Sequence, residues 1–192
     1  MKSTILLFSF ILLASFLSTS IAQNKSEEFF IKTEDMEGIS FEVQAYIEDD
    51  QRMIQIKSNG LSAVNENATF SIDGKVISAE VADLNSDGYP ELLIFLSSEN
   101  NCGDVLAYSV NNGKSMSQVY FPSLDLHGNL DDGYEGCDSY KIVNNTLQRE
   151  FPIYNSNHHT TGQLRQIEYT LVDGEASRHL IVKRVAIISE WQ

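Results

Sequence analysis

Hydrophobic and polar residues alternate along much of the chain with a period of two, the spacing of a β-strand buried on one face. The alternation is clear from Phe41 to Ile47, and a second run, Met53 to Ile56, follows a polar turn. Leu92 to Leu96 is instead continuously apolar, which predicts a central strand buried on both faces. Further strands are predicted at residues 70–72, 76–81, 105–110, 140–143, 146–154, 164–172 and 179–188.

Turn residues separate these strands: Glu48 to Gln51, Asp73-Gly74, Asn111-Asn112-Gly113, Asn144-Asn145 and Asp173-Gly174. The pair Asp73-Gly74 predicts a hairpin between its two flanking strands. Ser123 to Asp138 lacks the alternation and is predicted to be one long loop. No amphipathic helix, repeat or linker interrupts the pattern. We therefore predict one all-β domain over residues 23–192, an antiparallel β-sandwich or a partly open barrel.

The first 22 residues have the pattern of a cleavable secretory signal peptide. Lys2 gives a basic start, Ile5 to Leu17 is apolar, and Ser20-Ile21-Ala22 places small residues before the expected cleavage point. The apolar run is too short for a membrane anchor, and no other segment is apolar enough to span a membrane. The predicted location is therefore periplasmic or secreted, with 170 residues left after cleavage.

The chain is strongly acidic, with 13 Lys and Arg against 27 Asp and Glu and a formal charge of −14. Removing the predicted signal takes away Lys2 and no acidic residue, so the charge becomes −15. Such a chain is a poor partner for nucleic acid or for anionic lipid. A basic protein or a cation suits its field, although acidity also serves solubility alone.

Cys102 and Cys137 both lie after the predicted signal, and a lone pair in an exported chain is most simply one disulfide. The bond would close a loop of 35 residues and tie the end of the long loop to the segment at Cys102. A metal site lacks further ligands at useful spacing, and a redox pair is more often Cys-x-x-Cys.

The segment from 83 to 91 has the look of a calcium-binding loop. Oxygen ligands would come from Asp83, Asn85, Asp87 and Glu91, with Gly88 at the sharp turn. Ile94 stands where an EF-hand needs a glutamate, so only a β-loop calcium site is considered, and no other cofactor is predicted. The alternative is a tight acidic turn whose Asp and Asn side chains accept hydrogen bonds from backbone N–H groups.

No catalytic motif stands out, and carboxylates are too abundant to single out an acid–base pair. His158-His159 lies in a polar segment, where neighbouring side chains point to opposite faces, and is predicted to be a solvated loop. Basic residues of the C-terminal strands are predicted to form ion pairs at the rim: Arg165, Arg178, Lys183 and Arg184. We therefore expect a binding protein and not an enzyme.

Four stretches of the chain resemble, in the family's order, the periplasmic inhibitors of invertebrate-type lysozyme from Gram-negative bacteria. They are Asp83 to Leu92, Leu106 to Ser115, Thr146 to Tyr154, and Gly162 to Leu171 followed by Gly174-Glu175-Ala176. Together they cover most of residues 80 to 182, whereas the N-terminal third has no counterpart. The resemblance implies an all-β sandwich that plugs the cleft of a basic lysozyme, or a related cell-wall hydrolase, with one loop. The alternative is an orphan or calcium-stabilised β-sandwich binding module with a different ligand.

In this chain the implied loop reads Ser97-Ser98-Glu99-Asn100-Asn101-Cys102-Gly103-Asp104, with Cys102 in place of the family's tyrosine. A second loop, usually Gly-His-Asp, reads Gly136-Cys137-Asp138, which agrees with a disulfide between neighbouring loops. The partner-binding residues implied are Ser97, Ser98, Glu99, Asn100, Asn101, Gly103, Asp104, Tyr134 and Asp138. A lysozyme cleft holds two carboxylates, so the serines can enter as neutral donors, whereas Glu99 or Asp104 would be repelled unless a cation at the rim answers them.

Overall fold

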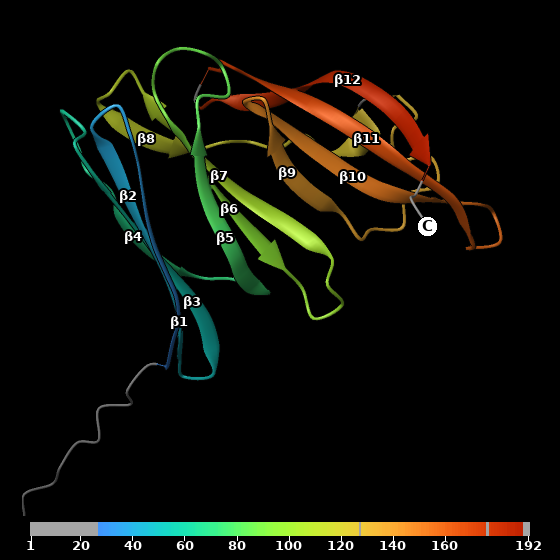
Figure 1. The fold of residues 1–192 in the computed structure, drawn as a ribbon, viewed down its shortest axis with the longest axis horizontal. Helices are drawn as coiled ribbons and strands as arrows, with labels where there is room; N and C mark the ends of the chain where they lie inside the picture. The colour runs from blue at the N-terminus through green and yellow to red at the C-terminus, as the bar shows by residue number, and fades with distance from the viewer. Residues whose placement is uncertain (1–26, 127, 176, 190–192) are drawn as a thin grey trace, which may run out of the picture.

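The computed structural model describes residues 27–126, 128–175 and 177–189, and the predicted signal peptide lies outside these ranges. Within them the chain forms twelve strands in three antiparallel four-stranded sheets, which do not close into a barrel (Figure 1). This confirms the predicted all-β antiparallel fold. No helix in the described ranges is both long and apolar enough to cross a membrane.

Each sheet consists of four strands that are consecutive in the sequence. Sheet A contains β1 (Glu27–Met36), β2 (Ile39–Glu48), β3 (Gln51–Asn59) and β4 (Asn67–Ser71). Sheet B contains β5 (Lys75–Ala82), β6 (Glu91–Ser97), β7 (Gly103–Asn111) and β8 (Ser115–Gln118). Sheet C contains β9 (Ser139–Val143), β10 (Thr146–Tyr154), β11 (Thr160–Val172) and β12 (His179–Ser189). A short 3-10 helix, η1 (Leu124–Leu126), lies in the long loop between β8 and β9.

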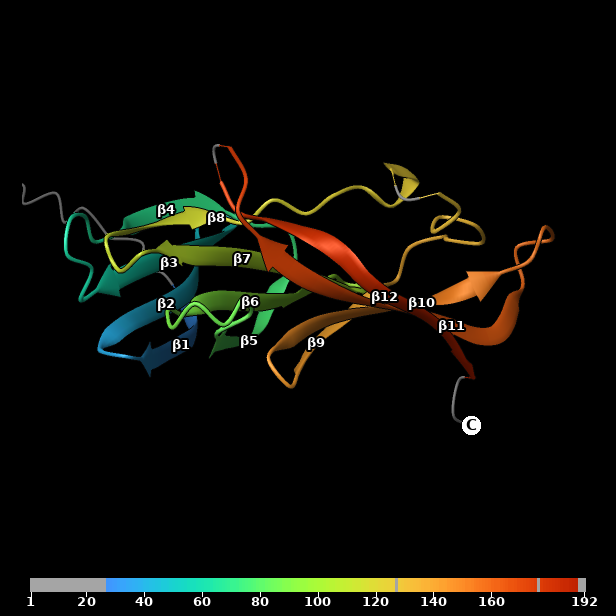
Figure 2. The ribbon, with the colours of Figure 1, turned by 90° about the horizontal axis from the view of Figure 1, so that it is seen from above.

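Sheet B is the middle layer, and β6 is buried on both of its faces as predicted. Leu92, Ile94 and Leu96 belong to the core shared with sheet A, whereas Leu93 and Phe95 belong to the core shared with sheet C. Sheet A and sheet C therefore lie on opposite sides of sheet B, as Figure 1 shows. In Figure 2 the long strands of sheet C continue well beyond the other two sheets.

Alternation along the strands supplies these two cores. Sheet A contributes the inward residues of β2 and β3: Ile39, Phe41, Val43, Ala45, Ile54 and Ile56. Sheet C contributes Leu147, Phe151, Ile167, Tyr169, Leu171 and Leu180. The four stretches that resemble the lysozyme inhibitors lie in sheets B and C and in the turns that join their strands. Sheet A, which has no counterpart in that resemblance, covers the other face of sheet B.

The hairpin predicted at Asp73-Gly74 is wrong, although the turn itself is present. β4 pairs with β3 and β5 pairs with β6, so this turn carries the chain from sheet A to sheet B. Turn residues alone do not distinguish a hairpin from a crossing between sheets, because an Asp-Gly pair suits any tight turn. The turns at Asn144 and Asp173 do join paired strands, as predicted. The turn after Asn111 joins β7 to β8, a strand that was not predicted.

Two strands were absent from the sequence prediction. β1 carries five charged residues among its ten, and its Ile31 side chain is exposed, so the alternation that marks β2 is missing. β8 is short and mostly polar, with the sequence Ser-Met-Ser-Gln. Both are edge strands that pair with a single neighbouring strand, and such strands show little hydrophobic alternation in their own sequence.

We expect Leu92→Ala and Leu93→Ala each to lower the free energy of unfolding by about 2–5 kcal/mol, because the two fully buried side chains occupy opposite faces of β6. Ile187→Ala is the control, since Ile187 is 57% exposed and should cost less than about 0.5 kcal/mol. Urea unfolding at one pH measures all three. A negligible cost at either leucine would contradict the middle position of sheet B.

Candidate functional site

A disulfide joins the two loops that the resemblance singles out. Cys102 and Cys137 are bonded, with Cα atoms 4.3 Å apart, which confirms the predicted pair. Beside the bond, the Gly103 N–H donates to the Asp138 carbonyl oxygen at 2.6 Å. A Cβ on Gly103 would lie 2.8 Å from that same oxygen, so only glycine permits this approach. The β6–β7 loop is thereby fixed against the end of the long loop.

The tip of the β6–β7 loop is a tight turn with exposed side chains. The Ser98 N–H donates to the Cys102 carbonyl at 2.9 Å, and the Asn101 N–H donates to the Ser98 carbonyl at 3.0 Å. The Ser98 hydroxyl also accepts from the Cys102 N–H at 3.2 Å. The side chains of Ser98, Glu99, Asn100 and Asn101 are exposed, whereas Ser97 and Gly103 are partly buried. We call residues 98–101 the tip.

Tyr134 and Asp138, in the long loop between β8 and β9, are held by Arg149 of β10. Arg149 donates to the two Asp138 carboxylate oxygens at 2.5 and 3.0 Å, and to the Tyr134 hydroxyl at 3.0 Å. Tyr134 in turn donates to Asp138 at 2.6 Å, and its ring packs edge-on against Phe151. Burial and the Asp138 hydrogen bond raise the pKa of Tyr134 above its ordinary value. These hydrogen bonds therefore fix the end of the long loop to β10, and the disulfide passes this support to the β6–β7 loop.

The acidic turn between β5 and β6 is capped by its own side chains. The Asp83 carboxylate accepts from the N–H groups of Asp87 and Gly88, both at 3.0 Å. Asn85 also accepts from the Asp87 N–H, and Asp87 accepts from the Tyr89 N–H. These are the bonds of the capped-turn alternative. In the described part of the chain, no group of three or more His, Cys, Asp or Glu is arranged for a metal. Calcium would compete for the same oxygens, and its binding stays a prediction.

Arg178 supplies the positive charge of this turn from the β11–β12 loop. Its guanidinium contacts Asp87 at 2.6 Å, Ser109 at 2.7 Å, the Val110 carbonyl and Asp173 at 3.1 Å, and Glu91 at 3.4 Å. Glu91 is fully buried and also accepts from the Leu84 N–H and the Ser109 hydroxyl, each at 2.7 Å. The prediction of a rim position for Arg178 is wrong, because its residue is only 7% exposed.

The remaining basic and histidine predictions have mixed outcomes. Arg184 pairs with Glu168 on the neighbouring strand, as predicted, whereas Arg165 donates to the carbonyl oxygens of Asn129 and Leu130. His158 and His159 are exposed, as predicted for a solvated loop. His158 lies 2.6 Å from the Glu135 carboxylate, which connects the β10–β11 turn to the long loop.

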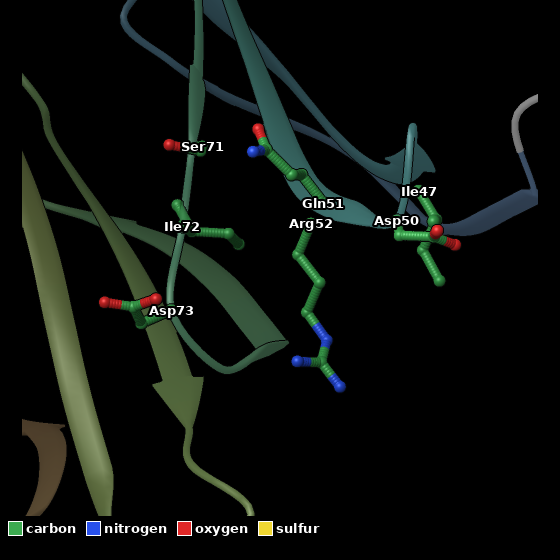
Figure 3. A pocket seen from close by; sticks show the side chains of 7 residues that line it. All are labelled: Ile47, Asp50, Gln51, Arg52, Ser71, Ile72 and Asp73. Carbon is green, nitrogen blue, oxygen red and sulfur yellow. The ribbon is translucent and has the colours of Figure 1, made fainter.

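Three neighbouring hollows lie at the end of the molecule that carries the tip. The first, shown in Figure 3, has a volume of about 440 Å³ and is lined by Ile47, Asp50, Gln51, Arg52, Ser71, Ile72 and Asp73. The second, of about 290 Å³, shares Arg52 and adds Lys75, Ile77 and residues of the β6–β7 loop. The third, of about 180 Å³, shares Ile77, Ser97 and Asn101 and reaches Tyr140. Sequence reasoning singled out neither Arg52 nor Lys75, because each is an isolated cation in a strand pattern.

Comparisons with protein-family models and with curated proteins gave no match to this chain. The resemblance to the lysozyme inhibitors therefore rests on the four sequence stretches alone. The disulfide and the all-β fold agree with it, and both also occur in proteins of many other functions.

Replacing both cysteines, Cys102→Ala with Cys137→Ala, should lower the free energy of unfolding by about 3–4 kcal/mol, because the unfolded chain loses a 35-residue loop constraint. Urea unfolding with and without a thiol reductant measures this, and the reductant should affect only the wild type. Thiol titration of the oxidised, denatured wild type should find no free cysteine. Two free thiols there would contradict the bond.

Burial raises the pKa of Glu91 from 4.5 to about 7, against the opposing hydrogen bonds from Ser109 and Leu84 and the charge of Arg178. The folded state therefore holds this proton more tightly than the unfolded state does. The resulting stabilisation is fully present below pH 4.5 and is lost as the pH rises through about 7. Between pH 5 and pH 8 the wild type should therefore lose about 2–3 kcal/mol of unfolding free energy that Glu91→Gln keeps, because glutamine does not ionise. Urea unfolding at both values tests this, and parallel pH profiles would contradict it.

Proposed function

We propose that the chain is an exported binding protein that occludes the cleft of a basic invertebrate-type lysozyme or a related cell-wall hydrolase. One observation supports this proposal above the others. The disulfide holds both loops implied by the resemblance at one end of the molecule and leaves the tip exposed. An exposed tip on a fixed loop is the geometry that insertion into a cleft requires.

The roles of the predicted residues divide between contact and support. In this proposal the tip enters the cleft, and the Ser98 hydroxyl and the amides of Asn100 and Asn101 act as neutral hydrogen-bond donors. Tyr134 and Asp138 support the loop, because their polar groups are already bound by Arg149. A loop that is ordered before binding loses less conformational entropy on association, and this favours affinity.

Charge acts on two length scales in this proposal. The formal charge, −14 for the full sequence and −15 after removal of the predicted signal, attracts a basic partner from a distance and raises the association rate, most strongly at low salt. At the cleft itself, Glu99 on the tip meets the hydrolase's own carboxylates and is repelled. Occlusion in this proposal therefore requires positive charge near the tip.

The proposed place of action is the periplasm or the space outside the cell. Structural disulfides persist in oxidising compartments and are rare in the cytosol, so the bond between Cys102 and Cys137 is compatible with export. The predicted signal peptide points the same way. A cell-wall hydrolase would be met in the same compartment.

In a turbidity assay with bacterial cells, we expect a molar excess of the purified mature chain to suppress lysis by an invertebrate-type lysozyme. Asn100→Trp should abolish the suppression, because a bulky side chain on the tip blocks entry into the cleft. Asn59→Trp is the matched control. It is also exposed, but it lies at the end of β3 opposite the hollows, and it should inhibit like the wild type.

Full lytic activity in the presence of excess wild-type chain would overturn the proposal. Equal inhibition by Asn100→Trp and the wild type would show that the tip does not enter the cleft. Circular dichroism and a melting curve for each variant establish that the fold is retained. The Asn100 side chain is exposed and makes no hydrogen bond in the described structure, so a folding defect at this position is not expected.

A further inference from the structure

We propose that Arg52 and Lys75 form a carboxylate-binding site beside the tip and recognise the acidic residues of the hydrolase cleft. This inference rests on the function proposed above and names the chemistry by which the same site would recognise its partner. The site is the second hollow, of about 290 Å³, which the two cations share with Ser97, Ser98, Glu99 and Asn101.

Backbone contacts fix both cations next to the loop. Lys75 opposes Ser97 in the ladder between β5 and β6. At Gly74, the preceding residue, a Cβ would lie 2.7 Å from the Ser97 carbonyl oxygen, so the β4–β5 turn touches the loop directly. Arg52 is tied to the same turn, because its carbonyl oxygen accepts from the Ile72 N–H at 2.9 Å.

Arg52 and Lys75 are exposed and have no side-chain partner in the described part of the chain. Most other cations there are neutralised by acids. The pairs are Lys32–Glu34, Lys57–Glu42, Lys141–Glu150, Arg149–Asp138, Arg178 with Asp87, Glu91 and Asp173, and Arg184–Glu168. In so acidic a chain, an unpaired cation beside the tip can bind an external anion without breaking an internal ion pair.

The balance of charge distinguishes the second hollow from its two neighbours. It contains two cations against one carboxylate, that of Glu99. The first hollow has Asp50 and Asp73 against Arg52, and Figure 3 shows the guanidinium turned away from both carboxylates. The third hollow has Asp104 and no cation in its lining, and its other carboxylate, that of Asp138, is paired with Arg149. An incoming carboxylate is therefore favoured in the second hollow and disfavoured on either side of it.

This arrangement suits the cleft of a glycoside hydrolase, which works with a pair of carboxylic residues. The planar guanidinium of Arg52 can donate two parallel hydrogen bonds to one carboxylate, and Lys75 adds a point charge from the neighbouring sheet. The serine and asparagine groups complete a set of donors. The two cations also offset the repulsion between Glu99 and the cleft, which the tip alone would suffer.

The test is the dissociation constant of the full mature chain with an invertebrate-type lysozyme, measured for three variants that each remove one positive charge. We expect Arg52→Gln and Lys75→Gln each to weaken binding by about tenfold or more, because each removes charge-assisted hydrogen bonds. Lys114→Gln is the control and should bind like the wild type. Lys114 is also exposed and unpaired in the described structure, but it lies in the β7–β8 turn at the opposite end of β7.

Glu99→Gln should act in the opposite direction and tighten binding, because it removes the carboxylate that competes with the partner's. With a lysozyme whose two catalytic carboxylic residues are changed to amides, the dissociation constants of the wild type and of Arg52→Gln should become nearly equal. Persistence of the full difference would overturn recognition of those carboxylates.

The outcomes separate this inference from the proposed function. If the wild type binds and all three cation variants bind equally well, the carboxylate site is wrong and the inhibitor proposal stands. If the wild type does not bind the lysozyme, both are overturned. Unchanged melting temperatures for Arg52→Gln and Lys75→Gln are expected, because neither side chain has a partner to lose.

Discussion

The burial of β6 on both faces governs how this chain folds. A strand apolar at every position from Leu92 to Leu96 cannot face water on either side, so a sheet must cover each face. Sheet A covers one face and sheet C the other. The same burial extends to Glu91 at the start of the strand, where an isolated carboxylate would be costly. The Ser109 hydroxyl and the Leu84 N–H donate hydrogen bonds to the Glu91 carboxylate, and Arg178 forms an ion pair with it. Arg178 thereby connects sheet B to the β11–β12 loop.

The same layering brings the proposed site together from separate parts of the chain. Sheets B and C hold the stretches that resemble the lysozyme inhibitors, and the disulfide joins their loops at one end. Sheet A belongs to the N-terminal third, which has no counterpart in the resemblance, yet it supplies Arg52 to the hollow next to the tip. The added layer thus does more than cover a hydrophobic face. It changes the charge of the surface beside the tip.

Sequence reasoning predicted what local pattern determines and missed what depends on pairing across the chain. Alternation in β2 and the continuous run in β6 are local, and both strands were predicted correctly. The disulfide followed from the presence of one cysteine pair. The role of Asp73-Gly74 as a crossing between sheets is not local, because the same turn residues suit a hairpin. The burial of Arg178 depends on acids about ninety residues away along the chain, and no residue spacing in the β11–β12 loop signals them.

Chain order and sheet order coincide in this molecule, and this has a consequence for the speed of folding. Each sheet is made only of strands that follow one another in sequence, so most β-pairing closes a short loop. Short loops cost little chain entropy, and folding rates rise as the mean sequence separation of contacts falls. An all-β protein with interleaved strands must instead bring distant segments together before any sheet is complete. Here every β-ladder joins strands that are consecutive in the chain, and the contacts of high sequence separation are links between sheets, such as Arg178 to Glu91 and Cys102 to Cys137.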